Sequence, residues 1–517
     1  MKRLLCLLLC CCTVFSLLTG CQSSDEPYVP TGDGLTWDEE DPNAAATQPP
    51  ASEAQELTLI YYPDITLNPL RCTDFTNKAI LSLMYQGLFT VDRDYNVEPM
   101  LCSRYTMSES MRTYTFYLDE KAAFSDGEKV TPEDVVATLK FAKSNGVYRS
   151  RFNKVSSISV GEDGGVVIKL STAYENFPLL LDVPILKEEE LELELPLGTG
   201  PYVFTDYGMG AQLTRQNRWW CSAPDMVITA PVIRLVEAES VNQIRDEFQF
   251  GDLDLVQANT GSDRYADYLC DYELWDSENG VFLYLAFNQN SDYFDDADVR
   301  AAITYGINRD MIVSDYYKGF ARSASLPASP MCPYYNTSLA SRYDYDPVAF
   351  VTAVQNVSLD GKTLVMIVNG KDSHRVRVAN AIKDMLAAAG ITVKIQTYSG
   401  GDYSYALRNL EYDMYLGQTI LSPNMDLSHF FSSSGNLNYG GIDDITAYTL
   451  CQQALENHGN YYTLHQTVME EGLICPILFA SYAIYATRGL LTELTPARDN
   501  VFYYSIGRTM EEAFIRE

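Results

Sequence analysis

Hydrophobic residues recur in two patterns along the chain from residue 57 onward. Apolar positions at helical spacing predict helices over 76–89, 297–307 and 375–390. Alternating or continuous apolar runs predict strands at the following positions: 57–62, 113–118, 164–170, 281–289, 363–369, 391–398 and 474–487. Because strands and helices are interspersed, the pattern predicts a large multidomain α/β protein.

Three segments carry more specific signals. Thr131-Pro132-Glu133-Asp134 combines a hydroxyl cap, a proline at the first helical position and acidic residues, which predicts a helix start. Residues 363–398 read strand, helix, strand with short connections, which predicts a right-handed crossover between parallel strands. The strand at 281–289 is apolar almost throughout, which is typical of a strand buried on both faces of a parallel sheet.

The N-terminal 21 residues have the layout of a secretory signal, because two basic residues precede an apolar run of about fifteen residues. That run is shorter than the roughly 20 residues that span a bilayer. It ends in Leu18-Thr19-Gly20-Cys21, which resembles the bacterial lipobox, where the cysteine is lipidated and becomes the new N-terminus. We therefore expect a signal peptide at 1–20 and a lipid on Cys21. Ordinary cleavage beside an incidental cysteine is the alternative.

Residues 22–56 are rich in proline, alanine, serine and acidic residues and contain no basic residue. Such a segment cannot bury enough apolar surface to fold. A flexible chain of this length has an end-to-end distance of roughly 30 Å. We expect residues 21–56 to form a disordered acidic tether that holds a globular body off a membrane.

Composition excludes several classes of function. The 517 residues are 46% hydrophobic, which is enough to build real cores, but 37 basic residues face 69 acidic ones. Without the N-terminal 56 residues the balance is still 35 basic against 60 acidic. A body this acidic is repelled by nucleic-acid phosphate and by an anionic membrane surface. We therefore expect no nucleic-acid partner and no membrane contact except through the N-terminal lipid.

Signatures of catalysis and of metal binding are missing from the sequence. There is no G-x-S-x-G elbow and no H-E-x-x-H motif, and none of the 4 histidines has a second at a spacing of four residues. Seven scattered cysteines remain in the body, with no C-x-x-C pair, so most are expected to be small buried residues and at most one or two disulfides form. The sequence predicts a protein that is not an enzyme and has no metal site and no cofactor.

Aromatic and amide side chains give the positive signal. The chain has 37 tyrosines, more than its 21 phenylalanines and 4 tryptophans together. Several tyrosines, amides and one histidine follow predicted strands, where ligands bind in open α/β sheets. These candidate ligand-binding residues are Tyr61, Tyr62, Asn68, Gln257, Asn259, Asn369, His374, Tyr398 and Tyr403. Each could instead serve ordinary packing; together they favour a binding crevice over a reaction centre.

A series of motifs, in one order, extends through most of 57–517. They are LNPL (67–70), GLFTVD (87–92), TYTFYL (113–118), FSDGEKVTPEDV (124–135), LGTGPYVF (197–204), GDLDLV (251–256), FNQN (287–290), DADVRAAITYGINRDMI (296–312), AAAGITVKI (387–395) and YDMYL (412–416). In this order they resemble the extracytoplasmic solute-binding proteins of peptide- and nickel-type ABC importers (bacterial solute-binding family 5). The signal, lipobox and acidic tether are similar to those of Gram-positive members.

The resemblance implies a two-lobed α/β fold of the periplasmic-binding-protein type (type II), with an extra subdomain inserted in lobe I. The expected division is lobe I at 57–72, 196–272 and 476–517, the inserted subdomain at 73–195, and lobe II at 273–475. Two strands would cross between the lobes as a hinge, and a ligand would shift an open–closed equilibrium.

The resemblance also bears on the substrate. Peptide-binding members hold the peptide's amino terminus with an aspartate in a segment that here reads LGQTILSPNMDL (416–427). Gln418 stands where the family has tryptophan and Leu421 falls at the aspartate, while Asp426 could substitute only if the loop is rebuilt. Asn369 and His374, by contrast, match a segment that contacts peptide carboxylates in some relatives. His374 as a mere helix cap is the alternative.

These observations favour a lipid-anchored, extracytoplasmic receptor that captures a short peptide and passes it to separate ABC permease and ATPase subunits. We expect it to be a monomer. Another small solute, such as a metal chelate, a modified amino acid or an oligosaccharide, is the alternative within the same class. A secreted lipoprotein hydrolase, or a sensory or adhesive module without a transporter, is the alternative from another class.

Overall fold

A computed structural model describes residues 57–208, 210–221, 230–262, 267–442, 444–491, 494–498, 500–502 and 514–516. The predicted signal peptide, Cys21 and the acidic tether lie outside the described residues. Contacts divide the chain into Met1–Ser52 and Glu53–Glu517, and only the second unit is described below. In the described part of the chain, no helix has both the length and the apolarity needed to cross a membrane.

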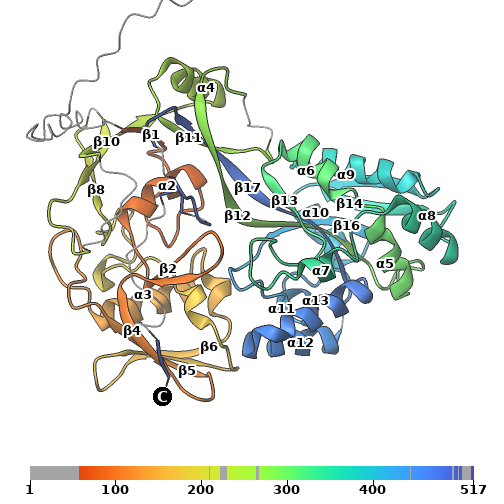
Figure 1. The fold of residues 1–517 in the computed structure, drawn as a ribbon, viewed down its shortest axis with the longest axis horizontal. Helices are drawn as coiled ribbons and strands as arrows, with labels where there is room; N and C mark the ends of the chain where they lie inside the picture. Colours follow the sequence, from red (N-terminus) through yellow and green to blue (C-terminus); the bar gives the residue numbers. More distant parts are fainter. Residues whose placement is uncertain are drawn as a thin grey trace, which may run out of the picture. The chain divides into compact units, whose positions relative to one another are not determined.

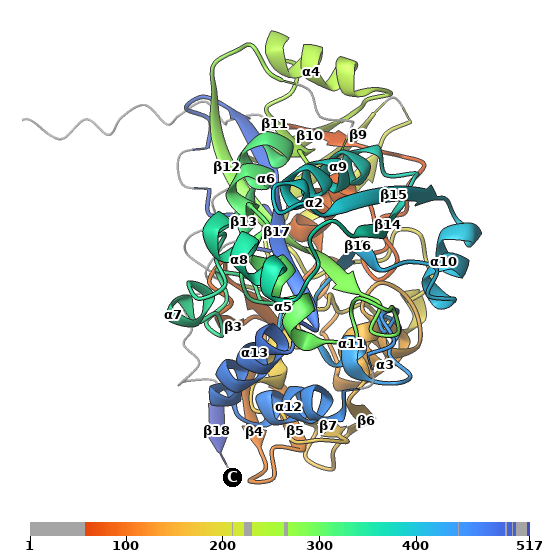
Figure 2. The ribbon, with the colours of Figure 1, turned by 90° about the vertical axis from the view of Figure 1, so that its right-hand side faces the viewer.

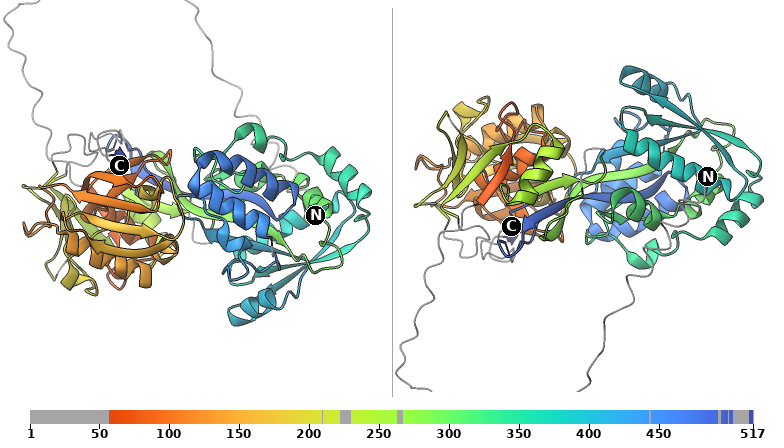
Figure 3. Two further views of the ribbon diagram at one scale, coloured as in Figure 1. Left: turned by 90° about the horizontal axis from the view of Figure 1, so that it is seen from below. Right: turned by 90° about the horizontal axis from the view of Figure 1, so that it is seen from above.

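One sheet of eleven strands runs through the whole of this unit (Figure 1). Its order is β15 (Thr392–Tyr398), β14 (Thr363–Asn369), β16 (Met414–Ile420), β12 (Tyr272–Phe287), β17 (Ile474–Thr487), β11 (Leu255–Asn259), β1 (Leu57–Tyr61), β10 (Val232–Glu237), β9 (Ala211–Arg215) and β8 (Tyr202–Asp206), with β13 (Ala321–Ser323) also on β17. We call the elements from β1 to β11, together with β18, lobe I and those from α5 to α13 lobe II. The long antiparallel strands β12 and β17 pass from one lobe to the other (Figure 3).

Lobe I carries a second, smaller sheet. Its strands, in order, are β18 (Phe514–Arg516), β4 (Cys102–Met107), β5 (Thr113–Leu118), β7 (Val166–Leu170) and β6 (Val155–Val160), and β2 (Phe89–Val91) pairs separately with β3 (Val97–Pro99). The helices are α2 (Phe75–Met84), α3 (Pro132–Ser144) and α4 (Val241–Phe250), with short 3-10 turns η1 (Arg149–Phe152), η2 (Phe177–Leu180) and η3 (Glu188–Glu190). The predicted helix start is confirmed: Thr131 and Asp134 form a reciprocal capping box at α3.

Lobe II is largely helical around β14, β15 and β16 (Figure 2). Its helices are α5 (Ala297–Tyr305), α6 (Arg309–Tyr317), α7 (Thr337–Ala340), α8 (Pro347–Asn356), α9 (Ser373–Ala387), α10 (Gly401–Arg408), α11 (Ser428–Phe431), α12 (Ile445–Glu456) and α13 (Tyr461–Glu470), with the turn η4 (His458–Asn460) before α13. Strands β14 and β15 pair in parallel on either side of α9 in sequence, so the predicted strand–helix–strand unit with parallel strands is confirmed, while its right-handedness stays a prediction.

Two predictions about local structure are wrong. The apolar strand at 281–289 is part of β12, whose neighbours β16 and β17 are both antiparallel to it. The strand is apolar because it lies in the interior of the sheet between β16 and β17, where both of its faces are buried. The direction of its neighbours does not change this burial. The helix predicted over 76–89 ends at Met84, because Tyr85 is extended with φ −130° and the chain turns into β2.

Apolar side chains of both lobes share one interior. Tyr284 of β12 packs edge-on against Phe430 of α11, with ring centroids 5.0 Å apart. The same cluster includes Tyr114 of β5 and Phe177 of η2 in lobe I. A second cluster lies within lobe II and is built around β14 and α9. The lobes are therefore joined by apolar packing as well as by the crossing strands β12 and β17.

Candidate functional site

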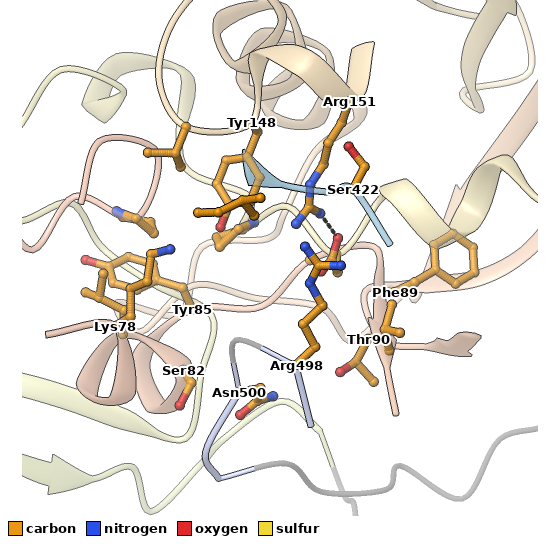
Figure 4. A pocket seen from close by; sticks show the side chains of 18 of the residues that line it. Lys78, Ser82, Tyr85, Phe89, Thr90, Tyr148, Arg151, Ser422, Arg498 and Asn500 are labelled. Atoms are coloured by element: carbon orange, nitrogen blue, oxygen red, sulfur yellow. Dashed lines mark hydrogen bonds and ion pairs between the residues drawn. The ribbon is translucent and has the colours of Figure 1, made fainter. Parts of the chain in front are cut away.

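A cavity of about 470 Å³ lies where lobe I faces the end of β16. Lobe I contributes α2, β2 and the segments 147–151 and 182–184 to its lining. Lobe II contributes residues 419–422, and Arg498 and Asn500 enter from the C-terminal segment (Figure 4). Among the apolar side chains that line the cavity, that of Ile420 has the largest exposed fraction, 66%. The cavity thus has walls from both lobes.

Helix α2 supplies one wall because it is fixed to the end of β1. The buried Asn77 accepts a hydrogen bond from the Tyr62 amide (3.0 Å) and donates to the carbonyls of Tyr62 (3.0 Å) and Ile65 (3.2 Å). The next residue, Lys78, lines the cavity and is half-buried. Tyr85, just beyond α2, also lines it, and its hydroxyl donates to the Pro196 carbonyl at 2.6 Å. Burial raises the pKa of this Tyr85 hydroxyl.

A second wall comes from the segment that follows α3. Gly146 has φ +77°, and a Cβ there would lie 2.1 Å from the Leu70 carbonyl oxygen, so only glycine allows this close approach. The chain then forms η1, whose Phe152 is fully buried. Arg151 forms an ion pair with Asp182, and its guanidinium lies over the Tyr148 ring, 4.8 Å from the ring centroid.

Arg498 closes the cavity on the side of β12. Its guanidinium donates to the Leu421 carbonyl, and a Cβ on Gly280 of β12 would lie 2.1 Å from Nη2 of Arg498. The Leu421 amide in turn donates to the Gly280 carbonyl at 3.0 Å. Figure 4 shows the guanidinium groups of Arg151 and Arg498 pointing toward each other in the cavity.

Comparison with known proteins places this two-lobed arrangement in a family. The profile of the bacterial extracellular solute-binding proteins, family 5 Middle, matches residues 96–439, well over half of the chain. The chain belongs to this family. The resemblance inferred from the ordered motifs is thereby confirmed.

Individual relatives are distant in sequence. The oligopeptide-binding protein AppA of Bacillus subtilis is 23% identical over 364 residues, which cover 64% of this chain and 66% of AppA. The glutathione-binding protein GsiB of Salmonella typhi is 24% identical over 380 residues, which cover 68% of this chain and 71% of GsiB. The ABC transporter substrate-binding protein CtaP of Listeria monocytogenes matches in structure with a TM-score of 0.71 at 20% identity, covering 86% of this chain and 97% of CtaP. This likeness confirms the expected two-lobed α/β fold.

The predicted departure from the family pattern has a structural counterpart. Leu421, which the resemblance puts at the aspartate of peptide-binding members, lines the cavity but is only 3% exposed. Gln418 is exposed on β16 and is absent from the lining. Asp426 accepts hydrogen bonds from the amide and the hydroxyl of Ser428, both at 2.9 Å, at the start of α11. Asp426 therefore does not replace the aspartate in this cavity.

The predicted residues near β1 have mostly structural surroundings. Asn68 has no exposed surface; it donates to the carbonyls of Leu191 (2.9 Å) and Leu193 (2.7 Å) and accepts from the Leu70 amide (3.0 Å). These hydrogen bonds give the Asn68 side chain a structural role, and its contact with ligand stays a prediction. Tyr61 is buried against Phe204, with ring centroids 5.5 Å apart. Tyr62 is half-buried.

Gln257 and Asn259 lie on β11, opposite Ile484 and Tyr482 of β17. The Oε1 atom of Gln257 is buried without a hydrogen-bond partner among the described residues. Asn259 accepts from the Gly261 amide at 3.0 Å and so shapes the turn that follows β11. Neither residue reaches the cavity of about 470 Å³.

The predicted residues of lobe II gather at the carboxyl ends of β14 and β15. Asn369 and Tyr398 are register partners there, and Tyr403 follows on α10, where burial raises the pKa of its hydroxyl to about 12. His374 is only 4% exposed: its Nε2 lies 2.7 Å from the Tyr316 carbonyl and its ring packs edge-on against Tyr317. The structure thus places His374 between α9 and α6, outside the lining of the cavity, and its contact with ligand stays a prediction.

Sequence reasoning missed most of the lining. The missed residues with polar or cationic side chains include Lys78, Ser82, Thr90, Tyr148, Arg151 and Arg498. They come from α2, β2, η1 and its approach, and the C-terminal segment, so no local spacing relates them. The one usable signal was Lys78, a charged residue within the apolar pattern of a predicted helix.

Proposed function

We propose that this protein is the substrate-binding component of an ABC importer, which captures a short peptide between its lobes and delivers it to a membrane permease. The observation that carries the proposal is the cavity of about 470 Å³ with walls from both lobes. That size is in the range of small-molecule sites, about 300–1,000 Å³. A ligand that contacts both walls would favour the closed arrangement in proportion to its preference for that state.

Two considerations support a peptide. AppA is named for oligopeptide binding and GsiB for binding glutathione, and both are relatives at 23–24% identity. The lining combines aromatic rings and hydroxyl groups with the exposed apolar side chain of Ile420, which suits a backbone with varied side chains. Leu421 at the family's aspartate position is the observation that favours the second candidate, a non-peptide solute such as a chelate, a modified amino acid or an oligosaccharide.

The proposal includes the features that sequence alone supports. The protein is held outside the cell membrane by a lipid on Cys21, acts as a monomer with separate permease and ATPase subunits, and performs no catalysis. The division into lobe I (57–72, 196–272 and 476–517), inserted subdomain (73–195) and lobe II (273–475) is kept as part of it. The Cys21→Ser variant should fail to incorporate labelled fatty acid; equal labelling of variant and wild type would contradict the anchor.

A peptide-retention assay tests the main proposal. The full-length chain, purified in detergent, is incubated with a tryptic digest of casein, and bound material is released under denaturing conditions for mass spectrometry. We expect short peptides to be retained in about equimolar amount and returned uncleaved. Retention of no peptide would contradict the peptide assignment, and cleavage of the pool would favour the hydrolase alternative.

A further inference from the structure

The charges around the cavity point to the chemical group through which a ligand is held. This inference rests on the proposed function and refines the class of solute. Three cationic side chains line the cavity, Lys78, Arg151 and Arg498. Among the described residues the only carboxylate in the lining is Asp182. This excess of positive charge occurs in a chain with a formal net charge of −32.

The carboxylate of Asp182 is already engaged, because it forms an ion pair with Arg151. Arg151 uses one terminal nitrogen in this pair, and its side chain is 9% exposed. A guanidinium has five N–H donors, so the remaining donors of Arg151 can serve a second acceptor in the cavity. Lys78 makes no side-chain hydrogen bond or ion pair with the residues that the structure describes. Its ammonium is therefore available as well.

Arg498 brings its own positive charge to the position where, by the resemblance, peptide-binding relatives hold the ammonium group of the peptide. The resemblance puts the aspartate that binds a peptide's amino terminus at position 421, and here the Leu421 carbonyl accepts a hydrogen bond from Arg498. Glu278, on β12 behind Gly280, supplies negative charge near Arg498, but its two oxygens accept from Tyr95 and Ser329 and it does not line the cavity. The charge offered at this end of the cavity is positive.

We propose that the cavity binds its solute through an oxyanion, in the first place a carboxylate, that Arg151, Arg498 and Lys78 hold together, and that it provides no carboxylate for a ligand ammonium. Bidentate arginine–carboxylate contacts are among the strong hydrogen bonds in proteins. The one carboxylate in the described lining, Asp182, balances only one of the three cationic side chains, so an anionic group is attracted into the cavity. The preferred solute is therefore an acidic or amino-blocked peptide, or another small acid, rather than a peptide recognised by its amino terminus.

Chemical modification of a peptide pool separates the two modes of recognition. A tryptic digest of casein is divided into an untreated portion, an N-acetylated portion and a portion methyl-esterified at its carboxyl groups. Each portion is incubated with the full-length chain, and retained peptides are quantified by mass spectrometry. We expect acetylation to leave retention unchanged and esterification to reduce it at least about tenfold, the cost of losing one charge-assisted hydrogen bond.

A matched pair of lysine variants assigns the effect to the cavity. Lys78→Met removes one ammonium from the lining and keeps an unbranched side chain that is one atom shorter, whereas Lys140→Met removes one from the exposed face of α3. Retention of the acetylated pool should fall about tenfold in Lys78→Met and stay at the wild-type level in Lys140→Met. Equal thermal unfolding midpoints of the two variants would establish that Lys78→Met is folded.

Several outcomes of these experiments would contradict the oxyanion proposal. Loss of retention on acetylation with retention kept on esterification would overturn the oxyanion proposal while leaving a peptide receptor. If the Lys78→Met variant retains peptides as well as the wild type does, the proposal that Lys78 helps to hold the oxyanion would also be overturned. If no portion is retained, citrate and inorganic phosphate are titrated by calorimetry. Binding of either that depends on Lys78 would uphold the oxyanion site and refute the peptide assignment, and absence of binding would refute both.

Discussion

Gly280 allows Arg498 to reach the cavity, and it does so in two ways. Its φ of +69° lies in the left-handed region, which side chains with a Cβ rarely adopt. A Cβ at this position would also lie 2.1 Å from the Arg498 guanidinium. Gly280 is at the irregularity of β12, where the register with β17 shifts between Glu278 and Phe282. This single position therefore couples the crossover strand to the cavity lining.

The effect of a methyl group at Gly280 can be separated from backbone strain. Gly164 has φ +82° and nothing within 4 Å of an added Cβ, so Gly164→Ala measures strain alone. We expect Gly164→Ala to lower the free energy of unfolding by about 1 kcal/mol. Gly280→Ala should lower it by about 1–3 kcal/mol more, because the guanidinium must move. Urea unfolding of both variants measures the difference, and equal losses would show that Arg498 does not pack on Gly280.

Asn68, which the sequence predicts as a ligand-binding residue, makes hydrogen bonds that give it a structural role. Its buried amide closes the turn after β1 onto the carbonyls of Leu191 and Leu193. Asn68→Ala leaves both acceptors and the Leu70 amide without this partner, so we expect a loss of about 2–4 kcal/mol in the free energy of unfolding. Retention of peptide at a temperature where the variant is folded should be unchanged. A loss of retention with unchanged stability would restore Asn68 to the ligand site.

At the scale of elements, β12 joins the lobes through two carboxylates that lie two residues apart and so face the same side of the strand. Asp276 lies 2.8 Å from Arg322 of β13 and 4.0 Å from Arg93, which follows β2. Glu278 accepts hydrogen bonds from Ser329 at 2.5 Å, on the lobe II side, and from Tyr95, in the β2–β3 turn. Each carboxylate thus receives one partner from each lobe.

Burial of Glu278 makes the stability of the fold depend on pH. Desolvation raises the pKa of its carboxyl above the ordinary 4.5, although Ser329, Tyr95, Arg498 and Arg322 act in the opposite direction. A raised carboxyl pKa means that the folded protein binds the proton more tightly. The contribution of Glu278 to stability is therefore fully present below pH 4.5 and is lost as the pH rises through the raised pKa.

Comparison of wild type with Glu278→Gln tests this sign. The glutamine cannot titrate, so the wild type should lose stability relative to this variant as the pH rises from 4.5 to 8. Urea unfolding at several pH values measures the difference, with Glu109→Gln on the exposed β4–β5 turn as the control for removal of one charge. A difference that is constant across this range, or that changes in the opposite direction, would contradict the buried carboxyl.

The same elements show what sequence can and cannot predict. The capping box at Thr131 and the strand–helix–strand unit at 363–398 depend on neighbours in sequence, and both were predicted. The direction of the neighbours of β12 depends on pairing with β16 and β17, more than 120 residues away, and was predicted wrongly. The lining of the cavity is hard to predict from sequence for the same reason, because Lys78, Arg151 and Arg498 come from separate segments that only the fold brings together.

At the scale of the whole described unit, the lobes also meet through contacts that do not involve β12. The Glu175 amide of lobe I donates to the Leu455 carbonyl of lobe II at 2.9 Å. Asn153 and His429 lie 2.7 Å apart through their side-chain nitrogens. His458 lies 3.7 Å from the Glu175 carboxylate and packs against the Tyr334 ring, 4.6 Å between centroids. We call the contacts between the lobes, Glu175–Leu455, Asn153–His429 and His458–Glu175, the lower seam. Separation of the lobes must break it.

Protonation of His458 should weaken the lower seam. Burial lowers the pKa of its imidazole below the ordinary 6.5, although the Glu175 carboxylate raises it. The stability that neutral His458 contributes is therefore fully present above pH 6.5 and is lost as the pH falls through the lowered pKa. Because the group is at an interface between lobes, part of that loss should be seen as local opening and not as global unfolding.

Hydrogen exchange at the Glu175 amide measures this opening directly. Between pH 7.5 and pH 5, its protection factor should fall in the wild type and change less in His458→Gln, which keeps a polar side chain without the charge. The Leu170 amide, which donates to the Arg112 carbonyl at 2.7 Å within lobe I, is the internal control and should change equally in both proteins. Equal falls at Glu175 in wild type and variant would mean that the lower seam does not depend on neutral His458. A fall confined to the wild type would show that neutral His458 stabilises the contact between Glu175 and Leu455.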